Sequence, residues 1–97
     1  MRYLMKDSTL NSGLVKEIQK VRGMISDRIP YIKKDIENII KNNIKSADKI
    51  ERLLDELLNY GQLGFGEKEF KRLNKYYSLI SKENSKSYDD FYKEMIK

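Results

Sequence analysis

Two acidic pairs have the clearest capacity for catalysis or metal binding in this sequence. Glu51 and Asp55 are four residues apart, and Glu56 follows directly. Carboxylates buried together can hold a hard cation or exchange protons with a substrate. The sequence contains no histidine or cysteine, which excludes histidine–cysteine zinc sites, thiolate nucleophiles and imidazole acid–base catalysis. Because Lys49 and Arg52 are nearby, we expect surface ion pairs, and no catalytic residue, metal site or cofactor.

Three glycines within residues 61–66 could form a phosphate-binding loop. Such a loop follows a strand and ends in Lys followed by Ser or Thr, so that amides, ammonium and hydroxyl converge on the anion. Here a predicted helix precedes the glycines, and Glu67 and Glu69 follow them. We therefore expect a helix C-cap and hinge, with Leu63 and Phe65 over the core. The alternative is a contact loop that offers these two side chains to a partner.

Positive charge is concentrated in the first half of the chain. The net charge is +5, and residues 50–97 carry equal numbers of basic and acidic side chains, so the excess lies in residues 1–49. A basic face in this half consists of Lys33, Lys34, Lys41 and Lys45. Such a face could follow a phosphate backbone, but no arginine cluster or aromatic platform accompanies it. We interpret it as a solvated face, with nucleic-acid binding as the alternative.

Tyrosines are concentrated in the second half of the chain. Tyrosine is enriched at protein interfaces because it buries a large area while its hydroxyl stays hydrogen-bonded. The sequence predicts a partner-binding patch. Its members are Tyr60, Leu63, Phe65, Tyr76, Tyr88 and Tyr92. In the alternative interpretation, Tyr77, Phe91 and Tyr88 belong to the core and the other tyrosines lie at its edges.

Apolar residues recur at helical spacing, and no segment shows the sustained alternation of a strand. We expect a helix over residues 12–28 with Leu14, Ile18, Val21 and Ile25 on one face. Pro30 disfavours helical geometry in the residue before it, so the pattern should break or kink there. Residues 1–10 could form a strand or an arm. The buried face of a second helix, starting near Pro30, would carry Ile32, Ile36, Ile39, Ile40 and Ile44.

Three further helices are predicted in the second half. Ser46 is a good N-cap for a helix that Gly61 ends, with Ile50, Leu53, Leu54, Leu57 and Leu58 inside. The next opens at Glu67 and buries Phe70, Leu73, Tyr77 and Ile80. Ser87 to Asp90 resembles a capping box and would start a short last helix carrying Tyr88, Phe91, Tyr92 and Met95. The sequence predicts one all-α domain over residues 1–97, a compact bundle of four long helices and a short fifth.

Composition also indicates a cellular and genomic setting. No apolar run approaches the roughly 20 residues that cross a bilayer, so we expect a cytoplasmic protein without membrane insertion. The frequent Ile, Lys and Asn residues favour A/T-rich codons. They indicate a low-GC bacterium, or one of its phages or mobile elements.

Residues 50–97 resemble small helical proteins carried by mobile elements of low-GC Gram-positive bacteria. The resemblance rests on Leu53–Tyr60, Phe70–Leu73, the pair Tyr76 and Tyr77, and the spacing of Tyr88, Tyr92 and Met95. It implies no activity. In size, charge and helix number the chain is also similar to the bacteriocin immunity proteins, which are four-helix bundles, and to small phage inhibitors such as anti-CRISPR proteins.

These features predict a non-enzymatic protein-binding module. It would be encoded by a phage or mobile element and would block a host or competitor protein, for example a CRISPR nuclease or other defence machinery. The alternatives are a bacteriocin immunity protein and a small basic nucleic-acid-binding protein. A homodimer is also compatible with the sequence.

Overall fold

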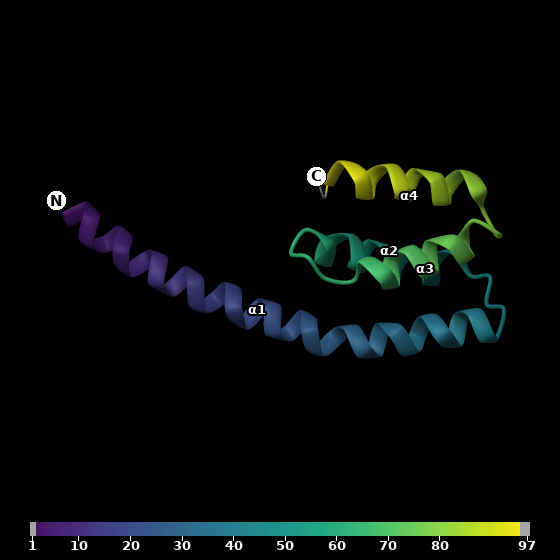
Figure 1. Ribbon diagram of the computed structural model, residues 1–97, viewed down its shortest axis with the longest axis horizontal. Coiled ribbons are helices and arrows are strands. Elements are labelled where there is room, and N and C mark those ends of the chain that lie inside the picture. Colours follow the sequence, from purple (N-terminus) through teal and green to yellow (C-terminus); the bar gives the residue numbers. More distant parts are fainter. Residues whose placement is uncertain (1, 96–97) are drawn as a thin grey trace.

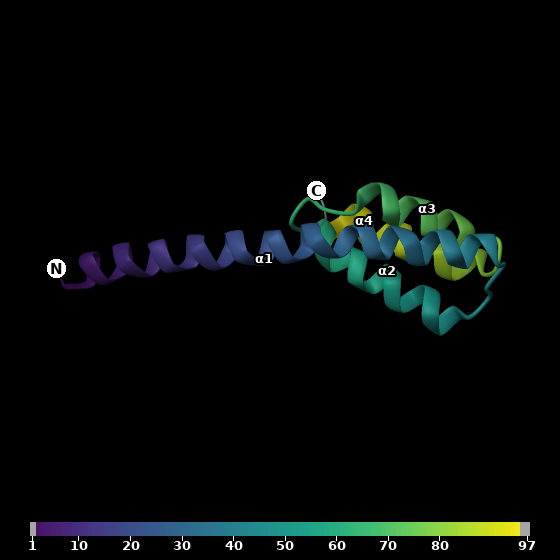
Figure 2. The same ribbon diagram turned by 90° about the horizontal axis from the view of Figure 1, so that it is seen from below.

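The computed structural model describes the backbone of residues 2–95 and the side chains of residues 19–95. Over this range the chain forms four helices and no strand, namely α1 (Arg2–Lys41), α2 (Ala47–Gly61), α3 (Glu67–Tyr77) and α4 (Lys82–Met95). The predicted all-α class is confirmed. α2 and α3 lie between the C-terminal half of α1 and α4, and these parts form the bundle (Figure 1). The N-terminal half of α1 projects beyond the bundle in both views (Figure 2).

The break predicted at Pro30 is wrong, because α1 continues through it from Arg2 to Lys41. Residues 2–10, expected as a strand or an arm, are therefore helical. Proline lacks the amide that would bond to the carbonyl of Ser26, and both residues are exposed, so water can satisfy that carbonyl. Ile32 and Ile36, after Pro30, are buried in the core. Their packing stabilises the helical conformation on the C-terminal side of Pro30. α1 curves with its concave side toward the bundle (Figure 1), as long helices wrapped on a core do.

Local residues determine where α1 ends and where α2 begins. Asn43 adopts a left-handed conformation with φ of 51°, which asparagine tolerates better than most residues, and α1 ends just before it at Lys41. Ile44 and Lys45, predicted as part of the second helix, lie in this connection. Ser46 then caps α2, and its Oγ accepts a hydrogen bond from the amide of Lys49 at 3.3 Å. The predicted N-cap is confirmed.

The core lies between three helices. Its members are buried apolar side chains spaced by three and four residues, which is why each helix presents one continuous apolar face. They are Ile32, Ile36 and Ile39 of α1, Ile50, Leu53, Leu54, Leu57 and Leu58 of α2, and Phe70, Leu73 and Tyr77 of α3. The inner faces predicted for α2 and α3 are confirmed, except that α3 ends at Tyr77. Ile80 lies in the following turn, half-buried against the core.

α4 begins earlier than the capping-box signature indicated. It starts at Lys82, and Ser81 precedes it with its Oγ accepting from the amide of Asn84 at 3.3 Å. Ser87 lies inside the helix, where its hydroxyl donates to the carbonyl of Glu83. The two predicted long helices before Lys41 are thus one, and the last helix is longer than predicted. Phe91, expected in the core in one interpretation, is 57% exposed.

Candidate protein-interaction surface

The apolar spacing of the α1 sequence continues past the end of the bundle. Ile18, Ile25, Ile32 and Ile39 are spaced by seven residues, which keeps them on one side of a helix. Ile25 is 6% exposed, but Val21, one turn earlier on the same side, is 45% exposed. We call Leu14, Ile18 and Val21 the α1 row. None of the other helices described runs beside the N-terminal half of α1 (Figures 1 and 2).

The loop between α2 and α3 forms the end of the bundle beside the α1 row. Gly64 and Gly66 have φ of 85° and 80°, a region that favours glycine. A Cβ at Gly66 would lie 2.8 Å from Leu57 Cδ2 and 3.4 Å from Ile29 Cδ1, so the loop backbone lies tightly against α1 and α2. As the sequence predicted, α2 ends at Gly61.

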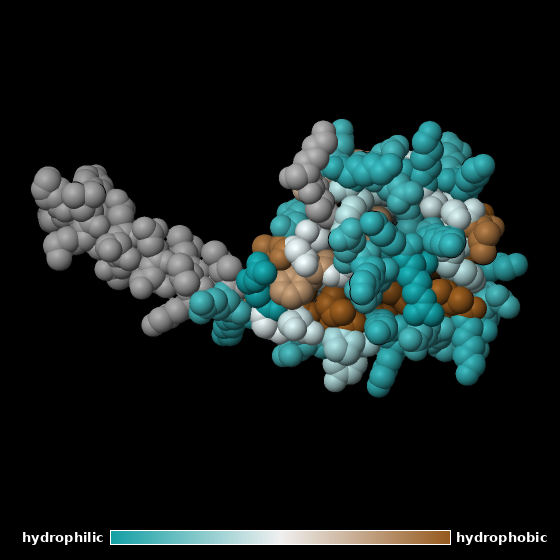
Figure 3. Space-filling view, viewed as in Figure 1, coloured by the Kyte–Doolittle hydropathy of each residue, from teal (hydrophilic) through white to brown (hydrophobic). Residues whose placement is uncertain are grey.

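The two apolar side chains of this loop are half-buried. Leu63 and Phe65 are neither in the core nor fully exposed, and the guanidinium carbon of Arg22 lies 5.1 Å from the centroid of the Phe65 ring. Apolar surface is visible at this end of the bundle, where α1 leaves it (Figure 3). Of the predicted contact residues, Phe65 therefore lies next to Arg22, which follows Val21 in α1. Val21 was predicted on one helical face with Ile25, and the structure leaves Val21 45% exposed while Ile25 is buried.

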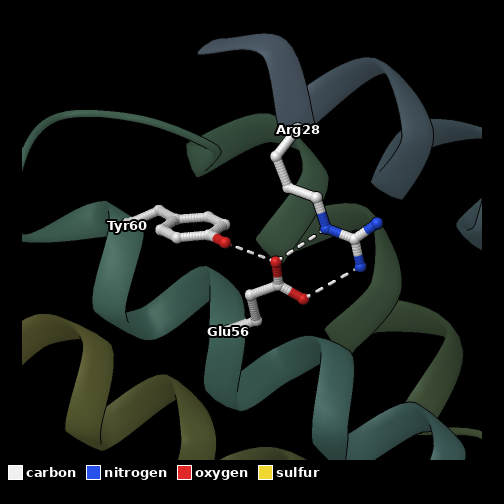
Figure 4. Close-up of polar contacts among 3 residues, drawn as sticks. All are labelled: Arg28, Glu56 and Tyr60. Carbon is white, nitrogen blue, oxygen red and sulfur yellow. Dashed lines mark hydrogen bonds and ion pairs between the residues drawn. The ribbon is translucent and has the colours of Figure 1, made fainter. Parts of the chain in front are cut away.

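Arg28, one turn after Ile25 in α1, pairs with Glu56 of α2 and so holds the two helices together (Figure 4). Arg28 Nε and Nη2 donate to Glu56 Oε2 and Oε1 at 2.8 Å and 3.2 Å, and the Tyr60 hydroxyl donates to the same carboxylate. The bond from Arg28 lowers the pKa of Glu56 below its ordinary value. Burial, and then the bond to Glu56, raises the pKa of Tyr60. The group holds α1 against α2.

The predicted tyrosine patch is spread over separate intrachain contacts. Tyr60 bonds to Glu56, Tyr76 donates to the carbonyl of Ile44 at 2.8 Å, and Tyr88 donates to Asp55 Oδ1 at 2.8 Å. Tyr92 stacks on Phe70 with ring centroids 4.5 Å apart. All four tyrosines are half-buried against the core. Their contact with a partner stays a prediction, and these intrachain partners already satisfy three of the hydroxyls.

The acidic pairs bond to groups other than those expected. Instead of Lys49 and Arg52, Glu51 accepts from Tyr77, Asp55 from Tyr88, and Glu56 from Arg28 and Tyr60. Within the described part of the chain, no three acidic side chains gather in a way that could hold a metal ion. The carboxylates of α2 therefore serve to join α2 to α1, α3 and α4.

The predicted basic face is divided by the fold. Lys33, Lys34, Lys41 and Lys45 are all exposed. Lys34 and Lys41 share one side of α1 by their spacing, whereas Lys33 lines a groove between α1 and α3 with Lys68 and Arg72. Lys45 lies beyond the end of α1. The four lysines do not form one continuous stripe along a helix.

Comparisons with known proteins yielded no relative. No protein-family model, no curated protein and no solved structure matches this chain. For the residues that the structure describes, no helix combines the length and the apolar character needed to cross a membrane.

Proposed function

We propose that this chain is a non-enzymatic protein-binding module that blocks a host or competitor protein, with the α1 row and the loop side chains Leu63 and Phe65 as its binding surface. The observation that carries the proposal is the α1 row itself. Leu14 and Ile18 continue the apolar spacing of α1 in the sequence before Val21. Val21 is 45% exposed, while Ile25, one turn further on, is 6% exposed. Apolar rows on soluble helices are normally covered by another element.

The mechanism would be steric. A partner seated on the α1 row contacts a helix that extends about 35 Å from the bundle, by the rise of 1.5 Å per residue over residues 2–24. Such an extension places the bundle across neighbouring surface of the partner, where it can block access. The Ile, Lys and Asn bias of the sequence supports a phage or mobile element of a low-GC bacterium as the source. Defence machinery such as a CRISPR nuclease is then a fitting target.

Affinity capture from lysate of a low-GC Gram-positive host tests this proposal. We expect wild type to recover a partner and Val21→Asp to lose it, because a charge in the α1 row is costly to bury. Gln19→Asp adds the same charge at an exposed position off the row and should recover the partner normally. Equal recovery by wild type and Val21→Asp would remove the α1 row from the proposal. Recovery of no partner by wild type would contradict the function.

Nucleic-acid binding is a second candidate, favoured by the exposure of Lys33, Lys34, Lys41 and Lys45. It predicts a DNA affinity that falls steeply as salt rises, because each neutralised phosphate releases a counterion. Lys34→Gln/Lys41→Gln should then reduce the salt slope. Absence of a DNA shift at low salt would exclude this candidate.

A further inference from the structure

The fold separates charges that are balanced in the sequence of residues 50–97. Glu51, Asp55 and Glu56 of α2 accept hydrogen bonds from side chains of the other helices. The basic side chains of α3 are instead all exposed. Their spacing of three and four residues places them on one side of the helix, so that the outer face of α3 is basic. They are Lys68, Lys71, Arg72 and Lys75.

Two grooves extend this basic surface onto the neighbouring helices. One groove lies between α3 and α1, and the other lies between α3 and α4. Lys33 of α1 lines the first and Lys93 of α4 lines the second, in each case with two basic side chains of α3. The surface therefore runs from α1 across α3 to α4. We call it the α3 basic face, and its members are Lys33, Lys68, Lys71, Arg72, Lys75 and Lys93.

Four members of the α3 basic face have no ion-pair partner among the described side chains. Arg72 pairs with Glu37 at 3.6 Å. Lys71 pairs with Glu67 at 2.9 Å. The other four are exposed lysines that make no such pair within the described residues, namely Lys33, Lys68, Lys75 and Lys93.

The acidic side chains beside the face reduce its charge without cancelling it. Glu69 lines the groove toward α1, and Asp89 lines the groove toward α4. Together with the carboxylates of Glu37 and Glu67, four negative charges stand against six positive ones, which leaves a net charge of +2. The face should therefore attract an anionic ligand that can reach several lysines at once.

The α3 basic face lacks the anchors of a protein or membrane interface. None of the large apolar side chains that are exposed in the described part of the chain belongs to it. The cores of protein interfaces are depleted in lysine and depend on apolar or aromatic anchors, and helices that lie on membranes bury an apolar face in the lipid. Lysine and arginine are, however, the usual contacts to nucleic-acid phosphates. These properties favour a phosphate backbone as the ligand.

The rings beside the face favour a duplex over a single strand. Phe70 and Tyr92 line a groove with Lys71 and Lys93, but they stack on each other with centroids 4.5 Å apart, and Phe70 is buried. Binding of single strands uses exposed aromatic rings on which successive bases stack. A duplex keeps its bases paired and presents only its backbone to such a face.

We propose that the α3 basic face binds the phosphate backbone of a nucleic-acid duplex without reading its sequence. This inference rests on nucleic-acid binding, the second candidate function, and moves the contact from Lys34 and Lys41 of α1 to α3 and its two grooves. The protein-binding function does not depend on it.

Fluorescence anisotropy of a labelled DNA duplex, titrated with the full chain, tests the inference. A duplex of about 20 base pairs offers two helical turns. One phosphate for each of the four unpaired lysines predicts a slope of about −3.6 when the logarithm of the binding constant is plotted against that of the salt concentration. A duplex of unrelated sequence should bind equally well, because backbone contacts carry no sequence information. An RNA duplex shows which nucleic acid is preferred, and binding of either supports the inference.

Matched variants place the duplex on the α3 basic face. Lys68→Gln/Lys75→Gln removes two charges but no ion pair, and the slope should become shallower by about 2. Lys49→Gln/Arg52→Gln removes the same charge from exposed positions on α2 and should change the slope little. Glu69→Gln removes a carboxylate beside the face and should tighten binding severalfold at low salt, a gain that misfolding cannot produce. Thermal unfolding shows whether each variant is folded.

Several results would overturn the inference. They are absence of a shift with any duplex at low salt, a strong preference for one duplex sequence, and tighter binding to polyglutamate or phosphatidylserine vesicles than to a duplex. A slope that changes in Lys34→Gln/Lys41→Gln but not in Lys68→Gln/Lys75→Gln would also overturn it, while nucleic-acid binding itself would stand. Val21→Asp leaves the α3 basic face intact, so its effect on partner recovery from lysate tests the protein-binding function separately.

Discussion

Arg28 and Glu56 form a two-bond ion pair between α1 and α2, although 28 positions separate them in the sequence. The pair is only partly buried, with side chains 41% and 26% exposed. It joins the C-terminal half of α1 to α2 near the point where α1 leaves the bundle.

Removal of either member should cost modest stability. We expect Arg28→Ala and Glu56→Gln to lower the free energy of unfolding by about 1 kcal/mol each. Because the two side chains act together, the double variant should lose less than the sum of the single losses. Urea unfolding of the four proteins measures this coupling. Strictly additive losses would show that the pair contributes nothing as a unit.

The same carboxylate makes stability depend on pH in acid. The pKa of Glu56 in the folded chain lies below its ordinary value of 4.5 because Arg28 bonds to the charged form. The unfolded chain therefore takes up this proton first as the pH falls. The contribution is complete above about pH 4.5 and is lost as the pH falls through the lowered pKa.

Urea unfolding of wild type and Glu56→Gln between pH 7 and pH 3 measures the effect. The stability difference between them should shrink over this range. Repeating the comparison in an Arg28→Ala background supplies the control, since the main cause of the shift is then absent and the change with pH should be smaller. A difference that stays constant with pH in wild type would contradict the assignment.

Asn74 and Ser85 should be a strong determinant of how α4 packs. Asn74 Nδ2 donates to the Ser85 carbonyl at 2.9 Å, and Ser85 Oγ donates to the Asn74 carbonyl at 2.8 Å, with both residues buried. Loss of a partner leaves a buried group unpaired, so Ser85→Ala should lower the free energy of unfolding by about 1–3 kcal/mol. Ser87→Ala, an exposed serine on the same helix, should change it by less than about 0.5 kcal/mol. Similar losses in thermal unfolding would contradict the role of Ser85.

Two glycines of the loop distinguish backbone strain from close packing. Gly64 and Gly66 both have a positive φ, but only at Gly66 would a Cβ meet neighbouring atoms. Gly64→Ala should cost about 1 kcal/mol, from the backbone alone. Gly66→Ala should cost about 1–3 kcal/mol more, because Leu57 must shift. Chemical unfolding of the two variants compares them, and equal losses would show that Leu57 moves without cost.

Local patterns were sufficient for the parts of the fold that depend on neighbouring residues. The leucine spacing of α2, the cap at Ser46 and the end at Gly61 are all determined within a few positions, and the structure has them as predicted. The start of α4 was missed because Ser81 and Ser87 both precede plausible first turns. Packing decides between them, since Ser85 must lie inside a helix to reach Asn74.

The candidate surface could be predicted only in part. Spacing placed Val21 and Ile25 on one face of the helix. Which of the two is buried depends on where the loop before α3 lies against α1. The surplus of tyrosines suggested a partner surface. Their hydroxyls instead reach acceptors such as Asp55 and Ile44, 33 and 32 positions away, and no local pattern reveals such pairs. The helix-breaking effect of Pro30 was overestimated, because tertiary packing on both sides of it outweighs the lost hydrogen bond.

The order of the helices has a consequence for synthesis on the ribosome. α1 is made first, yet the residues that cover Ile32, Ile36 and Ile39 come from α2 and α3. At about 5–20 residues per second, the stretch from Asn42 to Tyr77 takes about 2–7 seconds to be added. For an interval of this length, Ile32, Ile36 and Ile39 are exposed to solvent because α2 and α3 are not yet available to pack against them. We therefore expect α1 to be the first segment that a nascent-chain chaperone binds.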